Sequence, residues 1–231
     1  MKDLGLIGAS VFGLVLCGSA ATAQDFGRYR EFELGSAVAA VSTLTGVAGS
    51  ELKPIHQRPA VIQELTWRPR YAARSSPSRD VESVEQMVFD FYDDRLFRVT
   101  VDYDRKQTEG LTDDDIIEAI SEVYGSAVKP VAPRRSPSTA TYDDLGTRIA
   151  EWGNESHSVA LYRRSAYAIT FRLVITAEPV AALARTAASR AVALDAREAP
   201  QREAARQKKE ADARRAAEEK ARLTNKPIFR P

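Results

Sequence analysis

The chain has 231 residues, of which 44% are hydrophobic and 28% are charged, a composition typical of a soluble globular protein. This composition excludes a disordered chain and a chain made mainly of membrane spans. Lys and Arg number 33 against 32 for Asp and Glu, so the overall charge gives no reason to expect a nucleic-acid partner.

Residues 1–23 have the pattern of a cleavable signal peptide. A charged start at Lys2 is followed by an apolar run over 4–16, and then by small residues that end in Ala-Thr-Ala at 21–23, the pattern of a signal-peptidase site. The run is too short to cross a bilayer comfortably. We therefore expect an exported protein, periplasmic or secreted, whose mature chain begins at Gln24. The alternative is an uncleaved anchor or a buried helix.

Cys17 is the single cysteine of the chain and lies inside this segment. A lipidated cysteine normally follows a small residue, whereas Leu16 precedes this one, so we expect no lipid anchor here. Cleavage after Ala23 would leave a mature protein without cysteine. Such a protein has no disulfides, no thiol catalysis and no thiolate metal site.

Residues 31–105 predict a first unit of one helix and three strands. The stretch LGSAVAAVSTLTG has the features of a helix that begins with Ser36 as its N-cap and ends at Gly46. Its apolar face would consist of Val38, Val41 and Leu44. The stretch AVIQELTWRPR then predicts a strand with Trp67, whose place in the pattern favours the core.

The stretch VEQMVFDFYDDRLFRVTVDYD predicts a β-hairpin with one apolar face. Asp93 and Asp94 form the tight turn between its strands. The alternating apolar residues are Met87, Phe89 and Phe91 in the first strand and Phe97, Val99, Val101 and Tyr103 in the second. Asp90 and Asp102 would lie on the opposite face, where we expect solvent.

The acidic triplet at 113–115 predicts the start of a helix and not a metal site. Thr112 is a suitable N-cap for the backbone N–H of Asp115, and the helix dipole favours carboxylates in the first turn. Gly125 would end the helix in a left-handed conformation, and its apolar face would consist of Ile116, Ile117, Ile120 and Val123. An EF-hand loop beginning at Asp102 is disfavoured because its fifth and sixth positions are Lys106 and Gln107.

Residues 108–177 repeat the order of helix, tryptophan strand and hairpin. The stretch TRIAEWGNE predicts a strand with Trp152, and HSVALYRRSAYAITFRLVIT predicts two further strands. Their apolar faces would carry Val159 and Leu161, then Tyr167, Ile169, Phe171, Leu173 and Ile175. The sequence therefore predicts an α+β fold of two α-β-β-β units with antiparallel sheets, followed by a long C-terminal helix. How the two units pack stays open.

This order of elements on an exported chain resembles the tandem α-β-β-β arrangement of the β-lactamase inhibitor proteins. Single units of the same kind occur in the small lipoprotein of the outer-membrane β-barrel assembly machine. The likeness covers residues 31–177 and rests on element order: the helix start at Leu34-Gly35, the Trp67 strand and the hairpin from Phe89 to Tyr103, echoed by Leu111, Trp152 and Ile169. The chain lacks the disulfides of such inhibitors. The resemblance implies a binding module and not a catalyst.

Residues 179–231 predict a C-terminal helical arm and tail. Pro179 fits the first helical turn, and we expect an apolar stripe to dock on a sheet or a partner: Val180, Leu183, Ala187, Ala191 and Leu194. Pro200 should interrupt or restart the helix. The stretch from 201 to 222 is almost wholly Ala, Arg, Lys, Glu and Gln. It predicts either a solvated helix held by its own charge pairs or a basic arm that contacts an anionic surface.

Residues suited to catalysis or to cofactor binding are scarce. His56 and His157 lie in no metal-ligand spacing, and the chain has neither a G-x-S-x-G elbow nor a glycine-rich phosphate loop. We therefore expect a non-enzymatic protein with no cofactor and no metal site. The alternative is an enzyme whose site a single sequence does not reveal.

Two groups of residues are candidates for binding. Arginine side chains in loops suit carboxylates and phosphates: Arg68, Arg70 and Arg74 in one loop, and Arg134 and Arg135 in another. Ile228 and Phe229 place apolar side chains on the basic tail. The sequence favours a non-catalytic protein-binding module of the bacterial envelope or exterior, with another envelope or secreted protein as partner. The alternative is an envelope assembly factor whose arm contacts anionic membrane or cell wall.

Overall fold

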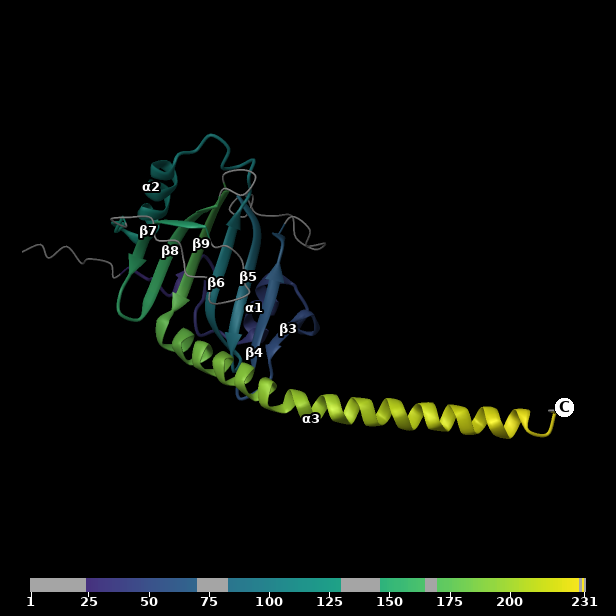
Figure 1. Cartoon of the computed structure of the whole chain (residues 1–231). Helices are drawn as coiled ribbons and strands as arrows, with labels where there is room; N and C mark the ends of the chain where they lie inside the picture. The colour runs from purple at the N-terminus through teal and green to yellow at the C-terminus, as the bar shows by residue number, and fades with distance from the viewer. Residues whose placement is uncertain (1–23, 70–82, 130–145, 165–169, 229, 231) are drawn as a thin grey trace, which may run out of the picture.

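The computed structural model describes residues 24–69, 83–129, 146–164, 170–228 and 230, and Figure 1 shows its elements. The first group is β1 (Arg28–Tyr29), β2 (Phe32–Glu33), α1 (Val38–Thr45), the 3-10 helix η1 (Gly49–Glu51), β3 (Lys53–His56), β4 (Ile62–Trp67), β5 (Val84–Tyr92) and β6 (Arg95–Tyr103). The second group is α2 (Asp113–Tyr124), β7 (Thr147–Gly153), β8 (His157–Arg164), β9 (Thr170–Ala177) and α3 (Glu178–Asn225). The expected signal peptide at 1–23 lies outside the described residues.

Seven strands form one antiparallel sheet in the order β3-β4-β5-β6-β9-β8-β7, and β1 and β2 form a separate hairpin. The strands that follow α1 and those that follow α2 are joined through their last members, because β6 pairs with β9. The predicted α+β class is confirmed, with antiparallel strands after each of two helices and a long C-terminal helix. The edge strand β3 and the β1–β2 hairpin are additions that the sequence pattern did not indicate.

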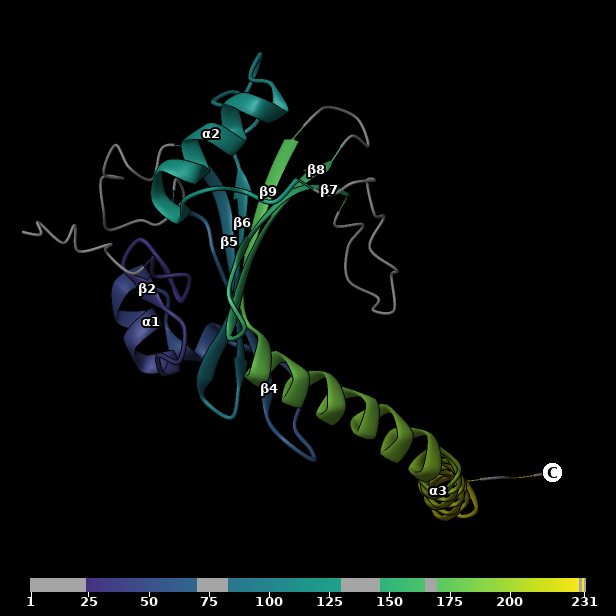
Figure 2. The ribbon, with the colours of Figure 1, turned by 90° about the vertical axis from the view of Figure 1, so that its left-hand side faces the viewer.

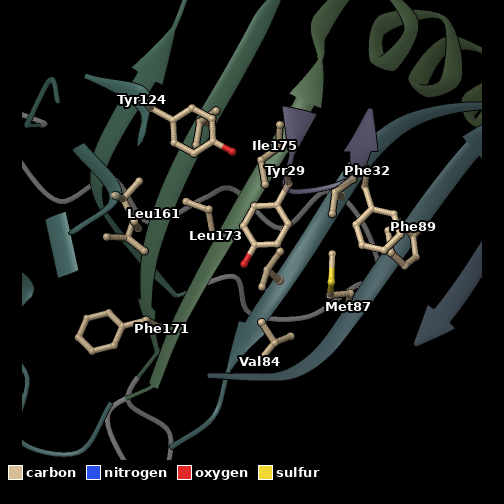
Figure 3. Close-up of a cluster of buried hydrophobic side chains, with 14 of the residues drawn as sticks. Tyr29, Phe32, Val84, Met87, Phe89, Tyr124, Leu161, Phe171, Leu173 and Ile175 are labelled. Carbon is tan, nitrogen blue, oxygen red and sulfur yellow. The ribbon is translucent and has the colours of Figure 1, made fainter. Parts of the chain in front are cut away.

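One face of the sheet packs against α1, α2 and the β1–β2 hairpin, as Figure 2 shows. Apolar side chains that alternate along the strands meet on this face, and Figure 3 shows how they converge from several strands and from α2. Many of them are at most 1% exposed, among them Phe89, Val101, Leu161, Leu173 and Ile175. Trp67 and Trp152 are 7% and 3% exposed, so both tryptophans lie in the core as the sequence predicts.

The turn of the β5–β6 hairpin caps α1. Asp93 and Asp94 have φ values of 45° and 63°, which a two-residue hairpin turn favours and which Asp tolerates better than most residues. The Asp94 carboxylate accepts the backbone N–H of Val38 at 3.0 Å. The prediction of Ser36 as N-cap is wrong: the N-cap is Ala37, which makes no side-chain cap, and the capping carboxylate comes from a residue 56 positions away.

The start of α2 agrees with the prediction. The Thr112 hydroxyl accepts the backbone N–H of Asp115 at 3.2 Å, and the Asp115 carboxylate accepts the backbone N–H of Thr112 at 2.7 Å. Together these bonds complete a reciprocal capping box. Gly125 ends the helix with φ 77° and ψ −159°, so the predicted left-handed helical conformation is wrong. This region of φ and ψ is open essentially to glycine alone.

Each of these two helices buries a residue one position beyond the one expected. Leu44 of α1 is 49% exposed and Thr45 is buried, while Val123 of α2 is 68% exposed and Tyr124 is buried. One position corresponds to a turn of about 100° around a helix, enough to move a side chain off the apolar face. The Tyr124 hydroxyl donates to the backbone carbonyl of Arg28 at 2.7 Å and so ties α2 to β1.

A β-bulge in β6 sends Phe97 to the other face of the sheet. The register pairs Asp90 with Arg98 but Phe91 with Leu96, so β6 contains one extra residue between these pairs. Leu96 lies in the main core, and Phe97, 5% exposed, packs in the cluster that contains α3. The prediction that Phe97 shares a face with Val99 and Val101 is wrong because one extra residue inverts a period of two.

α3 is one continuous helix of 48 residues that begins on the sheet and extends beyond it (Figure 1). Pro200 lies inside it, so the predicted interruption is wrong. Its buried residues are all alanines: Ala181, Ala184, Ala187 and Ala191. The first three of these pack with Ala60, Ile62 and Phe97. The expected stripe is therefore wrong in part, since Leu183 is 50% exposed. Arg58 adds an ion pair to Glu198 on α3.

Truncating Phe97 should weaken the packing of α3 on the sheet. We expect Phe97→Ala to lower the free energy of unfolding by about 3–5 kcal/mol, because a buried ring is lost and its space is left unfilled. Urea denaturation followed by circular dichroism measures this change. The matched control is Leu183→Ala on the exposed side of α3, which should change the free energy of unfolding by less than about 0.5 kcal/mol. Equal losses in the two variants would contradict the packing described.

Candidate functional site

The face of the sheet that carries α3 is mostly polar, and we name it the charged face. Its side chains are those that alternate with the core residues along each strand. α3 lies at one end of the strands on this side, whereas α1 and α2 lie on the opposite side, as Figure 2 shows. The strand registers order the side chains of the charged face into rows that cross the sheet.

Three such rows make up the charged face. The row nearest α3 consists of Glu64, Asp90, Arg98, Thr176 and Ser158. The middle row consists of Thr66, Val88, Thr100, Val174 and Ala160, and it ends on β7 at Glu151. The far row consists of Gln86, Asp102, Arg172, Tyr162 and Arg148. A strip of small, mainly uncharged side chains is thus flanked on both sides by charged residues.

The far row is organised around a buried ion pair. Arg172 donates from Nε and Nη2 to the two carboxylate oxygens of Asp102, at 2.6 and 2.9 Å. The Arg172 side chain is 6% exposed and that of Asp102 is 16% exposed. The two residues are direct cross-strand partners on β9 and β6, so strand pairing holds the geometry of this bidentate contact. Arg164 of β8 approaches the same carboxylate at 3.8 Å.

The row nearest α3 contains a second arginine fixed by a buried carboxylate. The Asp90 side chain is 8% exposed and accepts from Nε of Arg98 at 2.7 Å. The Arg98 guanidinium also lies 5.7 Å from the ring centre of Phe97, the residue that packs against α3. The Arg98 side chain is 42% exposed, so a partner can reach a cation whose orientation is already set. The prediction that Asp90 and Asp102 face solvent is wrong, because both lie largely buried in ion pairs.

Tyr162 lies in the far row, where its cross-strand neighbours are Arg172 on β9 and Arg148 on β7. Burial raises the pKa of its hydroxyl, and the nearby Arg148 opposes that rise. The hydroxyl therefore stays protonated at neutral pH and can donate a hydrogen bond. Arg148 in turn pairs with Glu151 at 2.9 Å. Tyr and Arg are among the residue types that most often dominate the energetics of protein interfaces.

A second polar group lies on the core side of the sheet. Tyr29 and Tyr103 share a side-chain hydrogen bond, and burial raises the pKa of both hydroxyls. Arg30 has φ 53° in the β1–β2 turn, and its guanidinium lies 5.2 Å from the ring centre of Tyr29. These contacts hold the β1–β2 hairpin on the sheet, which is a structural role.

The three aspartates at the start of α2 have three different partners. Asp113 accepts from Arg163 at 2.8 Å, Asp114 accepts from Lys129 at 2.6 Å, and Asp115 forms the capping box with Thr112. The hydrogen bonds from the Thr112 hydroxyl and backbone lower the pKa of Asp115. Within the part of the chain that the structure describes, no group of three or more His, Cys, Asp or Glu residues is arranged to hold a metal ion.

The structure describes two of the residues that the sequence indicates for binding. Arg68 follows β4 and donates to the side-chain oxygen of Gln86 at 2.9 Å, so it extends the far row. Ile228 is 69% exposed near the C-terminus. The others lie outside the described residues: Arg70, Arg74, Arg134, Arg135 and Phe229. The two histidines lie on β3 and at the start of β8, toward opposite edges of the sheet.

Comparisons of the chain with protein-family models, with curated proteins and with solved structures each found no match. Among the described residues, no helix is both long enough and apolar enough to span a membrane. The geometry of the charged face is therefore the basis for interpreting its function.

Removing one partner of the buried ion pair should destabilise the fold strongly. We expect Asp102→Ala to lower the free energy of unfolding by about 3–5 kcal/mol, because it leaves the Arg172 guanidinium buried without its counter-charge. The double variant Asp102→Leu with Arg172→Met should recover most of this loss, since no buried charge remains. Glu85→Ala, an exposed change on β5, is the control and should cost less than about 0.5 kcal/mol. Chemical denaturation measures the free energy of unfolding of each variant. If Asp102→Ala lowers it by no more than the control does, the buried ion pair is contradicted.

Proposed function

We propose that this protein is an exported, non-catalytic binding module of the bacterial envelope or exterior, and that it holds a protein partner on the charged face. The observation that carries the proposal is a pair of arginines, Arg98 and Arg172, each fixed by a buried carboxylate on either side of the middle row. Arg98 is the donor that a partner would meet, because its side chain is 42% exposed, whereas the buried Arg172 holds the far row in place. The Arg98 guanidinium is already ordered by Asp90, so less conformational entropy is lost on binding.

The middle row supplies the surface that such a partner would cover. Thr66 is exposed, and Val88, Thr100 and Val174 are half-buried. Small side chains let a partner approach the sheet closely, and the charged rows on both sides would form a polar rim around the contact. Charges placed in this way discriminate between partners more than they add affinity.

Several observations support a binding role over a catalytic one. The three rows of the charged face contain no histidine and no cysteine. The carboxylates of Asp90 and Asp102 are engaged by arginines, whereas a general base or nucleophile needs a neighbour that activates it. The signal-peptide pattern at 1–23 supports export, and the resemblance to the β-lactamase inhibitor proteins agrees with a binding module.

The C-terminal part of α3 favours a second candidate function, an envelope assembly factor. Residues 200–228 contain nine basic and five acidic residues. Those up to Asn225 continue α3 beyond the sheet (Figure 1). A basic helix of this kind suits an anionic membrane or cell-wall surface.

Affinity capture from envelope and culture fractions tests the charged face. We expect the unchanged chain to retain a protein partner and Thr66→Arg to reduce the retained amount by at least about tenfold, because a long cation then occupies the middle row. The matched control is Thr43→Arg, which places the same side chain on the exposed side of α1 and should retain the partner fully. Equal capture by both variants would contradict the proposal.

A chain that ends at Ala199 separates the two candidate functions. It keeps every buried residue of α3, the last of which is Ala191, and it keeps the Glu198 partner of Arg58. A partner retained by this shorter chain supports binding on the charged face. The function would instead belong to the C-terminal helix if the shorter chain no longer retains the partner while Thr66→Arg leaves the retained amount unchanged.

A further inference from the structure

The part of α3 from 200 to 225, which we name the arm, has no buried residue. At a rise of 1.5 Å per residue it extends for about 40 Å. Most helices in proteins are stabilised by packing one face against something else, and intrinsic propensity contributes less. The arm therefore has a face available to a partner along its whole length.

One face of the arm is basic. Positions spaced by three and four residues fall on the same side of a helix, and one such series in the arm contains no acidic residue. Glu203 and Glu210 lie along one edge of this series, beside Arg206. The residues of this basic stripe are Arg202, Arg206, Lys209, Ala213, Ala217, Lys220 and Thr224. Arg202 and Arg206 pair with acids of the same helix. Lys209 and Lys220 have no ion-pair partner within the described part of the chain.

The complementary surface is the outer side of α2. This helix has 12 residues, of which five are acidic and none is basic. Its apolar side is turned to the core through Ile116, Ile117, Ile120 and Tyr124, which leaves an acidic stripe outside: Asp114, Asp115, Glu118 and Glu122. Glu118 and Glu122 have no ion-pair partner among the described residues. Ala119 lies beside them and leaves room for a second helix, and Val123 next to it is 68% exposed.

The arm and the acidic stripe of one molecule are held apart. α2 covers one face of the sheet, whereas α3 starts on the other face and leads away from it, as Figures 1 and 2 both show. α3 is continuous through Pro200, so the arm reaches its own α2 only if the helix breaks. The arm of one molecule can reach the acidic stripe of α2 in another molecule without any break in the helix.

We infer that the arm of one molecule docks with its basic stripe on the acidic stripe of α2 in a second copy. The contact joins two different surfaces and is therefore heterologous, so it produces a ring if the rotation closes and an open chain if it does not. Exposed ion pairs are individually weak and are screened by salt. The assembly should consequently form at low ionic strength and dissociate in high salt. The inference does not depend on what the charged face binds.

Sedimentation velocity over a range of protein concentrations tests the contact with charge-reversal variants of the full chain. Lys209→Glu with Lys220→Glu reverses the two cations of the basic stripe that have no ion-pair partner among the described residues. Glu118→Lys with Glu122→Lys does the same for the two such anions of the acidic stripe. We expect the unchanged chain to form larger species at low ionic strength and each variant alone to remain monomeric. An equimolar mixture of the two variants should recover the larger species, because each reversed stripe then faces an opposite charge on the other variant.

The control is Lys208→Glu with Arg215→Glu, which changes the net charge of the arm by the same amount on a different face of the helix. This variant should assemble like the unchanged chain. The inference is overturned if the unchanged chain stays monomeric at low salt, if the control loses assembly as fully as the stripe variants, or if the mixture fails to recover it. It is also overturned if the arm binds vesicles of phosphatidylglycerol while no self-association occurs, since the basic stripe then serves a membrane surface.

Discussion

The antiparallel pairing of β6 with β9 is the interaction on which the rest of the structure depends. β6 is the last of the strands that follow α1, and β9 is the last of those that follow α2. Their register places Val99 opposite Ile175 on the core face. The same register places Asp102 opposite Arg172 on the charged face. One seam therefore closes the core beneath both helices and fixes the centre of the candidate site. A slip of β9 by one residue would turn Arg172 toward the apolar core and separate it from Asp102.

The bulge in β6 links the sheet to α3. Because Phe97 turns away from the core, an aromatic ring lies where the alanine side of α3 can pack on it. Alanines bring a helix close to a sheet but bury little area, so the direction of α3 depends mainly on this ring. The exposed Arg58–Glu198 ion pair adds a weaker contact. The arm is thereby aimed away from α2 and away from the core. Its exposed length and its charge then become surfaces for contact between molecules.

The sequence predicts those parts of the fold that depend on local pattern. The Asp93-Asp94 turn, the Thr112 cap and the alternating core residues need only neighbours in the chain, and all three are present. The bulge has no local signal, and the cap of α1 comes from a distant turn. The same limit applies to the candidate site. Asp102 and Arg172 both occupy polar positions of their strands, but their pairing could not be predicted without knowing that β6 and β9 are neighbours. Composition indicates the arginine-rich loops, and Arg68, their one member among the described residues, extends a row of the charged face.

Site-specific photocross-linking tests most directly the claim that the charged face holds a protein partner. Thr100 lies at the centre of the middle row, between Val88 and Val174, and Thr43 lies on the exposed side of α1. A benzoylphenylalanine replaces one or the other in cells that express the full chain, and irradiated samples are resolved by electrophoresis and mass spectrometry. We expect one discrete adduct with a different protein from position 100 and none from position 43. No adduct from position 100, or the same adducts from both positions, would contradict it.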